Sequence, residues 1–380
     1  MSSRIPPLLV GALGLAAAMG IGRFAFTPLL PLMQDRHALS LAQVGGLASI
    51  NYLGYLLGAL AFVVFSPAPQ AAARHGLVVV AATTLAMGLT ASFPAWLVLR
   101  LAAGVASAFV LVGVSGWTLA ALAREQRTAD AGWMFFGIGV GVCLAGIVGL
   151  VVGAAGADPA LGWLGLGGMA TFVAALAWRA LSHPEAVHAA LPAPPPRLAR
   201  FEFVRMVLCY GMVGFGYIIP ATFLPALARG LVADPRIYGL TWPVFGLAAA
   251  LSTAVAATVL RRVAPRWLWA GCMVVMALGV AVGVLFTGLA PLIVAAVCVG
   301  STFVLATLAG VQEARRVAGS AAPRLIAAMT AAFALGQLIG PLTLRSVGSI
   351  AEAAYLPSLA AASLLLASAG LLMFRPPRSA

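Results

Sequence analysis

The stretch GLAAAMGIGRFAFTPLLPLM, residues 14–33, places one arginine inside a long apolar run. The whole run extends from Pro6 to Leu32, and Arg23 lies roughly 25 Å along it at about 1.5 Å per residue. A charge deep in hydrocarbon costs about 2.5–3.5 kcal/mol and is tolerated where it faces protein, water or a bound anion. The stretch therefore predicts a membrane helix that faces a polar interior, with Arg23 as the first candidate for function.

Similar apolar runs fill the rest of the chain. Apolar residues make up 63% of the 380 residues and charged residues 8%, whereas soluble domains carry about 25% charge. Each run approaches or exceeds the roughly 20 residues that span a bilayer. We expect an all-α, polytopic membrane protein with twelve transmembrane helices: 6–32, 41–65, 75–92, 95–122, 131–156, 160–181, 203–228, 238–260, 266–287, 291–312, 324–347 and 353–374.

The arginines set the expected orientation. All 22 basic residues are arginine, and they recur in short loops rather than in one basic stripe, which argues against nucleic-acid binding. With a cytoplasmic N-terminus, 16 of them fall on the cytoplasmic side. The opposite side holds Arg36, Arg229, Arg236 and Arg345. This bias predicts a multi-pass protein of a bacterial inner membrane with both termini in the cytoplasm.

The chain divides into two similar halves. A Pro-rich segment at 182–201 separates a six-helix unit at 1–181 from another at 202–380. Residues recur between the halves at a nearly constant offset, 194 for the first three pairs and 196 for the last: Gly20 and Gly214, Pro31 and Pro225, Gly45 and Gly239, Gly104 and Gly300. The repeat predicts two pseudo-symmetric bundles.

Polar residues concentrate in the first, fourth, seventh and tenth helices, which we expect to line a central cavity. The third, sixth, ninth and twelfth helices are almost wholly apolar and suit lipid contact. The candidate substrate-binding residues are Arg23, Asn51, Tyr52, Tyr55, Arg100, Trp117, Tyr217 and Gln337.

Two interpretations stay open for each buried arginine. Arg23 either binds an anionic ligand or hydrogen-bonds to backbone carbonyls freed by the Pro28 and Pro31 kink. Arg100 either faces the cavity or extends its side chain to the outer interface. The nine acids all lie at predicted helix ends or in loops. An embedded arginine without a carboxylate suggests that an anionic substrate supplies the counter-charge, since its donor fork fits carboxylate or phosphate.

Small residues spaced by four mark the fifth and eleventh predicted helices. Such a stripe lets another helix pack closely or slide, so either static packing or a moving gate is expected. The residues assigned to gating or helix packing are Gly137, Gly141, Gly149, Gly153, Gly336, Gly340 and Pro341.

Signals for catalysis and cofactors are missing from the sequence. The four histidines fall in loops or at helix ends, the four cysteines lack metal-ligand spacing, and P-loop, HExxH and GxSxG motifs do not occur. We expect neither enzymatic activity nor a cofactor or metal.

Two local motifs resemble the major facilitator superfamily. Arg100-Leu-Ala-Ala-Gly104 is similar to its fourth-helix RxxxG motif, and the Gly-rich segment after Gly132 to its fifth-helix glycine motif, without the usual Gly-Pro. SPAPQAAARHG at 66–76 lacks the acid of the GxxxDRxGRR pattern, so the resemblance does not extend to the charge-relay gate there. The strings at 20–33, 51–60 and 333–341 resemble the YbfB/YjiJ-type branch. The resemblance implies transport by alternating access.

These observations lead to one hypothesis and three rivals. We expect a secondary transporter of a small organic anion such as a carboxylate, working as a monomer, in which Arg23 binds the anion and Tyr217 faces it from the other half. A coupling ion is a further candidate partner. Multidrug efflux would need a large apolar cavity for lipophilic, often cationic, substrates. A receptor or scaffold would need no path through the bilayer. An enzyme would need a nucleophile and base that the sequence lacks.

Overall fold

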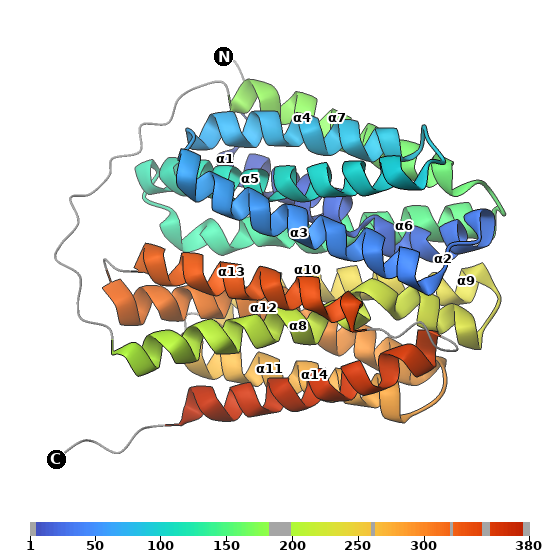
Figure 1. Cartoon of the computed structure of the whole chain (residues 1–380). Helices are drawn as coiled ribbons and strands as arrows, with labels where there is room; N and C mark the ends of the chain where they lie inside the picture. Colours follow the sequence, from blue (N-terminus) through green and yellow to red (C-terminus); the bar gives the residue numbers. More distant parts are fainter. Residues whose placement is uncertain (1–4, 182–198, 260–262, 320–321, 344–349, 375–380) are drawn as a thin grey trace.

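The computed structural model describes residues 5–181, 199–259, 263–319, 322–343 and 350–374. Within these ranges every regular element is a helix, and the long helices run side by side through one bundle (Figure 1). The first half contains α1 (Pro7–Leu15), η1 (Ala16–Arg23), α2 (Phe26–His37), α3 (Leu41–Phe65), α4 (Pro69–Met87), α5 (Phe93–Arg124), η2 (Thr128–Phe135), α6 (Phe136–Ala154) and α7 (Pro159–Ala180). The second half contains α8 (Arg200–Leu231), α9 (Pro235–Tyr238), α10 (Thr241–Val259), α11 (Pro265–Leu285), α12 (Leu289–Ala318), α13 (Ala322–Leu342) and α14 (Ile350–Met373).

The described residues hold 11 helical spans that are long and apolar enough to cross a membrane. The α4 helix is not among them, because Gln70, Arg74 and His75 lie in its first two turns and lower its hydropathy. It nevertheless packs along α5 and α7 as the others do (Figure 1). With α4, the described part of the chain contains the twelve membrane helices that the sequence predicts.

Several predicted helices differ from the structure in position, length or form. The helix predicted at 131–156 is 3-10 helical as far as Phe135, the one predicted at 291–312 is longer and ends at Ala318, and the one predicted at 324–347 is shorter and ends at Leu342. Two more differ as follows. The helix predicted at 75–92 spans Pro69–Met87 instead. Proline fits the first turn of a helix, where its missing N–H has no partner to lose, so Pro69 marks the start. The helix predicted at 6–32 continues to His37 and is not one α-helix, because residues Ala16–Arg23 form a π-helix between two α-helical pieces.

The predicted repeat is confirmed by matching glycine contacts in the two halves. A Cβ on Gly104 in α5 would lie 2.1 Å from the Asn51 carbonyl oxygen of α3. A Cβ on Gly300 in α12 would lie 2.4 Å from the Phe245 carbonyl oxygen of α10. Each pair joins the second and fourth membrane helices of its half, and only glycine permits such backbone approach.

The two halves lie one above the other in Figure 1, with α1–α7 above and α8–α14 below. They meet where α3 packs against α13, α6 against α10 and α2 against α8. The predicted linker at 182–201 falls almost wholly on residues 182–198, which lie outside the described residues. The limits of the two predicted domains, 1–181 and 202–380, therefore stay predictions.

The predicted glycine stripe of α6 packs within the first half. A Cβ on Gly137 or Gly141 would meet backbone of the first membrane helix, and one on Gly149 would meet Pro28. Gly153 lies near Pro235 of the other half. On the eleventh membrane helix, Gly336 and Gly340 pack against α8, and the carbonyl of Pro341 lies near Gly45. These contacts fit tight packing, and a gating role for the stripe stays a prediction.

The close contact of α6 with α10 uses glycines that the sequence analysis did not select. A Cβ on Gly139 would lie 2.2 Å from the Ala250 nitrogen, and one on Gly246 would lie 2.3 Å from the Cys143 nitrogen. The backbones of the two halves are in close contact here, so any rocking of one half against the other must rearrange this contact.

Gly139→Ala tests this contact. The new methyl group meets backbone of the other half and forces the helices apart, at a cost of about 1–3 kcal/mol. We expect a lower melting temperature in thermal unfolding and reduced transport. Gly168→Ala is the control, since a Cβ there has nothing within 4 Å and alanine favours a helix by up to about 1 kcal/mol. Equal melting temperatures for the two variants would contradict the assignment.

Candidate functional site

Arg23 lies at a break in the first membrane helix. It is the last residue of the π-helical η1, and Phe24 and Ala25 separate it from α2. Single π-helical turns often mark functional sites, because the wider turn re-aims side chains. The side chain of Arg23 is buried, with 2% of the residue exposed.

The guanidinium of Arg23 joins the two halves. Its Nη2 donates to Oε1 of Gln337 at 2.6 Å, and the Gln337 amide donates to the hydroxyl of Tyr217. The guanidinium carbon lies 4.0 Å from the Tyr55 ring centroid and 5.4 Å from that of Tyr52. The structure therefore brings Arg23 and Tyr217 together through Gln337.

Arg23 has no carboxylate partner among the described residues. Its Nε is buried and has no hydrogen-bond acceptor there either. A buried guanidinium with spare donors is costly unless an anion or ring faces complete its surroundings. The site is therefore suited to accept a negatively charged group.

Arg100 supports the backbone that carries Arg23. Its Nη1 donates to the Gly22 carbonyl at 3.2 Å and its Nη2 to the Arg23 carbonyl at 3.1 Å. Asn51 Nδ2 donates to the carbonyl of Arg100 at 2.8 Å. Hydrogen bonding to backbone carbonyls at the helix break, which was one interpretation of Arg23, is therefore the role of Arg100. The interpretation that the Arg100 side chain extends to the outer interface is wrong.

A cavity of about 660 Å³ lies between the halves. Of the predicted binding residues, Arg23, Tyr55 and Tyr217 line it. Asn51, Tyr52, Arg100, Trp117 and Gln337 are buried but do not line it. Tyr52 and Gln337 contact side chains of the site, whereas Trp117 has no hydrogen-bond acceptor for its Nε1 within the described part of the chain. Their roles stay predictions.

The predicted cavity-lining helices are confirmed, since η1, α5, α8 and α12 all contribute. The α3, η2, α6 and α13 segments add to the wall. Among the four helices assigned to lipid, only Pro265 at the start of α11 touches the cavity, at its rim.

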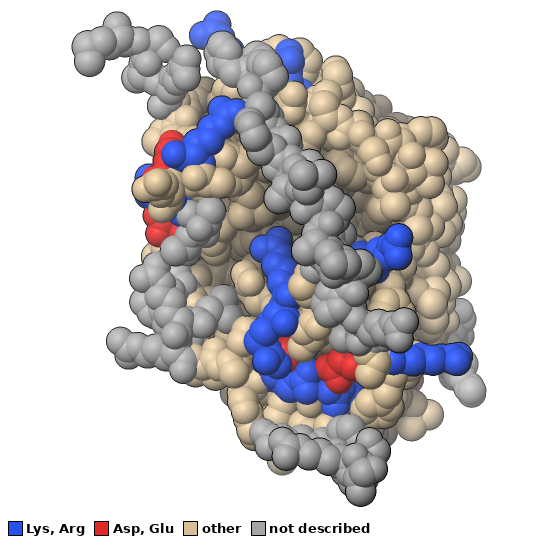
Figure 2. Space-filling view, turned by 90° about the vertical axis from the view of Figure 1, so that its left-hand side faces the viewer, with Lys and Arg blue, Asp and Glu red and all other residues tan. Residues whose placement is uncertain are grey.

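The cavity opens toward one end of the bundle, which we call the arginine-rich face. It is formed by the helix ends that carry Arg124, Arg200, Arg266, Arg315 and Arg316, and Figure 2 shows arginines gathered there with acidic residues beside them. Cavity-lining residues reach this face at the exposed Gln312 and Arg315. Arg23 lies at the inner end of the cavity and Arg315 at its opening.

The opposite end of the cavity is closed by contacts between the halves. Thr27 Oγ1 donates to the Ala221 carbonyl at 3.0 Å, and the hydroxyls of Tyr52 and Thr222 lie 3.1 Å apart. Further out, Arg229 of α8 forms an ion pair with Asp35 of α2. Its Nη1 also donates to the Pro31 carbonyl at 3.3 Å. The molecule is therefore open only at the arginine-rich face, as far as the described residues show.

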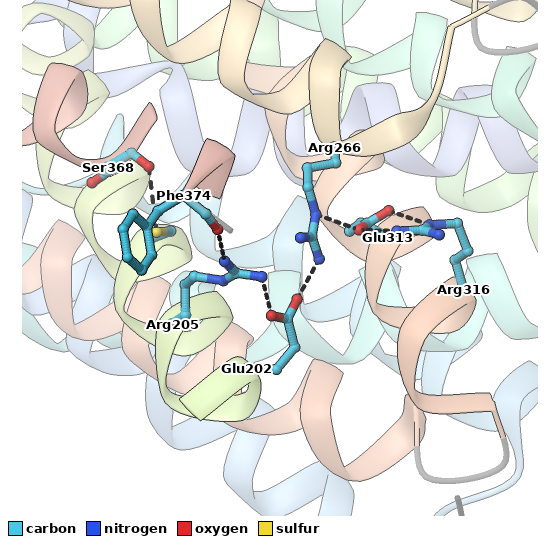
Figure 3. A network of polar contacts seen from close by, with 8 residues as sticks. Glu202, Arg205, Arg266, Glu313, Arg316, Ser368 and Phe374 are labelled. Carbon is cyan, nitrogen blue, oxygen red and sulfur yellow. Dashed lines mark hydrogen bonds and ion pairs between the residues drawn. The ribbon is translucent and has the colours of Figure 1, made fainter. Parts of the chain in front are cut away.

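An ion-pair network holds the second half together beside the opening (Figure 3). Glu202 pairs with Arg205 and Arg266, and Glu313 accepts from Arg266 at 2.7 Å and from Arg316. Glu313 was predicted beyond the end of a helix at 291–312, but α12 continues to Ala318 and buries it. Arg205 also caps the end of α14, donating to the Phe374 carbonyl at 2.7 Å.

The sequence analysis missed the aromatic wall of the cavity. Tyr217 stacks between Phe303 and Phe333, with centroids 5.4 and 5.6 Å away, and Phe333 contacts Tyr210 at 5.2 Å. The sequence alone does not distinguish aromatic residues that face lipid from those that face a cavity. The structure places all four rings on the cavity side of the second half.

Two solved transporter structures have a fold similar to that of this chain. A mutant of the nucleoside transporter NupG has a TM-score of 0.73 at 13% identity, covering 97% of this chain and 100% of that one. A bacterial homologue of the human lysosomal transporter Spinster, in an inward-facing and unoccupied conformation, has a TM-score of 0.70 at 15% identity, covering 96% and 95%. No curated protein sequence matches the chain.

The likeness to these structures shows that the chain has their fold. Residues 15–373 match the family described as uncharacterised MFS-type transporter YbfB, and the chain belongs to that family. The expected fold class and resemblance are thereby confirmed.

Replacing Arg23 and replacing Arg100 should change the stability of the unliganded protein by different amounts. Arg100→Met leaves two buried carbonyls without donors, at a cost of about 1–3 kcal/mol each. Arg23→Met removes a buried charge that has no ion pair in the described structure. The stability gained by removing this charge offsets the loss of the hydrogen bond to Gln337. We expect thermal unfolding to show a clear loss for Arg100→Met and a small change for Arg23→Met. The reverse order would contradict the division of roles.

The Arg229–Asp35 pair should hold the closed end shut. Arg229→Asp places two acids together and favours separation of α2 from α8, so a cysteine introduced at Thr27 should react faster with a thiol reagent added to that side of proteoliposomes. Asp35→Arg in the same chain should restore slow labelling. The pair is partly exposed, so an effect of only about 0.2–1 kcal/mol, up to roughly fivefold in rate, is expected. Identical labelling rates in all three proteins would show that the Arg229–Asp35 pair does not hold this end closed.

Proposed function

We propose that the protein is a secondary transporter of a small organic anion, with a carboxylate as the recognised group. One observation carries this proposal: a buried guanidinium lines the cavity and has no carboxylate partner among the described residues. Arginine's planar donor fork matches a carboxylate. Because the Arg23 contacts reach both halves, a bound anion would tie them together at their interface.

The arginine distribution supports a cytoplasmic arginine-rich face, with both termini on that side of a bacterial inner membrane. The cavity is then open to the cytoplasm. Separation of the α2–α8 contacts and closure at the arginine-rich face would expose the same site to the other side, which is alternating access.

Efflux of lipophilic cations is the weaker alternative. The size of the cavity, about 660 Å³, and its aromatic wall suit such compounds. However, its described lining includes two arginines and no acid, so a cation would be repelled from the inner end. The NupG likeness raises nucleosides as a further candidate, which a ligand panel includes.

Ligand-dependent thermal unfolding of the purified protein tests the proposal. An organic anion at about 100 times its Kd stabilises by about 2.7 kcal/mol. We expect stabilisation by carboxylates and not by their amides or by cations, and we expect Arg23→Gln to abolish it. Arg74→Gln is the matched control, because Arg74 stacks on Trp178 outside the cavity.

Stabilisation by carboxylates that persists in Arg23→Gln would contradict the assignment of Arg23 as the carboxylate-binding residue. Carboxylate counterflow in proteoliposomes separates a transporter from a receptor. A receptor would bind the anion and give no counterflow.

A further inference from the structure

The two halves contribute different surfaces to the cavity. The first half supplies the guanidinium of Arg23, with Phe24 and Tyr55 beside it, and then a largely aliphatic wall that includes Leu111 and Ile138. The second half supplies the rings of Phe303, Tyr217, Phe333 and Tyr210, each in contact with the next. A ligand that contacts both halves therefore meets a cation on one side and an aromatic wall on the other.

The aromatic wall begins at the depth of Arg23 and runs toward the opening. Tyr217 shares the Gln337 amide with Arg23, so it marks the inner end. Tyr210 lies seven residues nearer the arginine-rich face on α8, about 10 Å along the helix. That length accommodates one or two rings of a ligand whose charged end reaches Arg23.

The charge of the cavity fits a single negative group. Arg100 donates to the Gly22 and Arg23 carbonyls and does not line the cavity. The other lining cation, Arg315, lies twelve residues from Phe303 on α12, about 18 Å away along the helix, and is exposed at the opening. A second carboxylate on a small ligand would therefore be buried beside aromatic rings without a partner, which is costly.

From this arrangement we infer that the substrate is an aromatic monocarboxylate, whose carboxylate binds Arg23 and whose flat ring packs on the Phe303–Tyr217–Phe333–Tyr210 wall. The inference rests on the proposed function and narrows it. Ring contacts of this kind add about 0.5–1.5 kcal/mol beyond area burial, roughly a two- to tenfold gain over a saturated ring.

Binding to the full-length protein in detergent tests the inference with matched probes. Benzoate, phenylacetate and 3-phenylpropionate are each compared with the cyclohexyl compound of the same chain length, with the amide, and with terephthalate and uridine. We expect at least one aryl monocarboxylate to bind about two- to tenfold more tightly than its cyclohexyl partner. We expect terephthalate, the amides and uridine to bind at least tenfold more weakly than that aryl monocarboxylate.

Phe333→Leu is the diagnostic variant, and Phe303→Leu replaces it should the first variant fail to fold. We expect either change to weaken the aryl monocarboxylate about five- to tenfold and to leave its cyclohexyl partner unchanged. Phe62→Leu is the control, since it breaks an aromatic pair with Phe109 away from the cavity and should alter neither affinity.

The outcomes separate this inference from the proposed function. Equal binding of aryl and cyclohexyl carboxylates, still dependent on Arg23, would overturn the aromatic inference and leave the anion transporter standing. Tight binding of terephthalate would likewise overturn the single-charge assignment. Binding of uridine or the amides without any carboxylate would overturn both.

Discussion

A buried guanidinium without a carboxylate partner in the described structure is the constraint around which the molecule is arranged. Arg23 can lie in the bundle only because its backbone is fixed and its surroundings are polar or aromatic. Arg100 fixes that backbone by satisfying the Gly22 and Arg23 carbonyls. Because the Arg23 guanidinium is buried away from water and no described residue in the site neutralises its charge, it can attract an anion strongly.

In the described residues, the packing of the halves leaves this site reachable from the arginine-rich face. Close glycine contacts hold helices rigidly within each half, as at Gly104 and Gly300. Between the halves, an ion pair of Arg229 with Asp35 lies at the closed end, and close glycine contacts join α6 to α10. Under the proposed alternating access, a ligand that bridges Arg23 and the aromatic wall would bias which end opens.

Much of the fold and part of the site could be predicted from the sequence. Hydropathy predicted twelve helices because lipid requires long, apolar segments. The position of Arg23 deep within one of them identified it as a candidate functional residue. The π-helix could not be predicted, since an apolar run reads the same in sequence whether its turns are α-helical or π-helical. Arg100 stayed ambiguous because spacing shows which face a side chain occupies and not which carbonyl it reaches. The aromatic wall was missed because phenylalanines that face lipid and those that face a cavity look alike in sequence.

The most direct test of the central claim is an experimental structure of the protein with a stabilising aryl carboxylate bound. The account predicts a carboxylate oxygen about 2.7–2.9 Å from a guanidinium nitrogen of Arg23, with the ring against Phe333 and Tyr217. A ligand bound elsewhere in the cavity, with Arg23 still contacting only Gln337 and the surrounding rings, would contradict it.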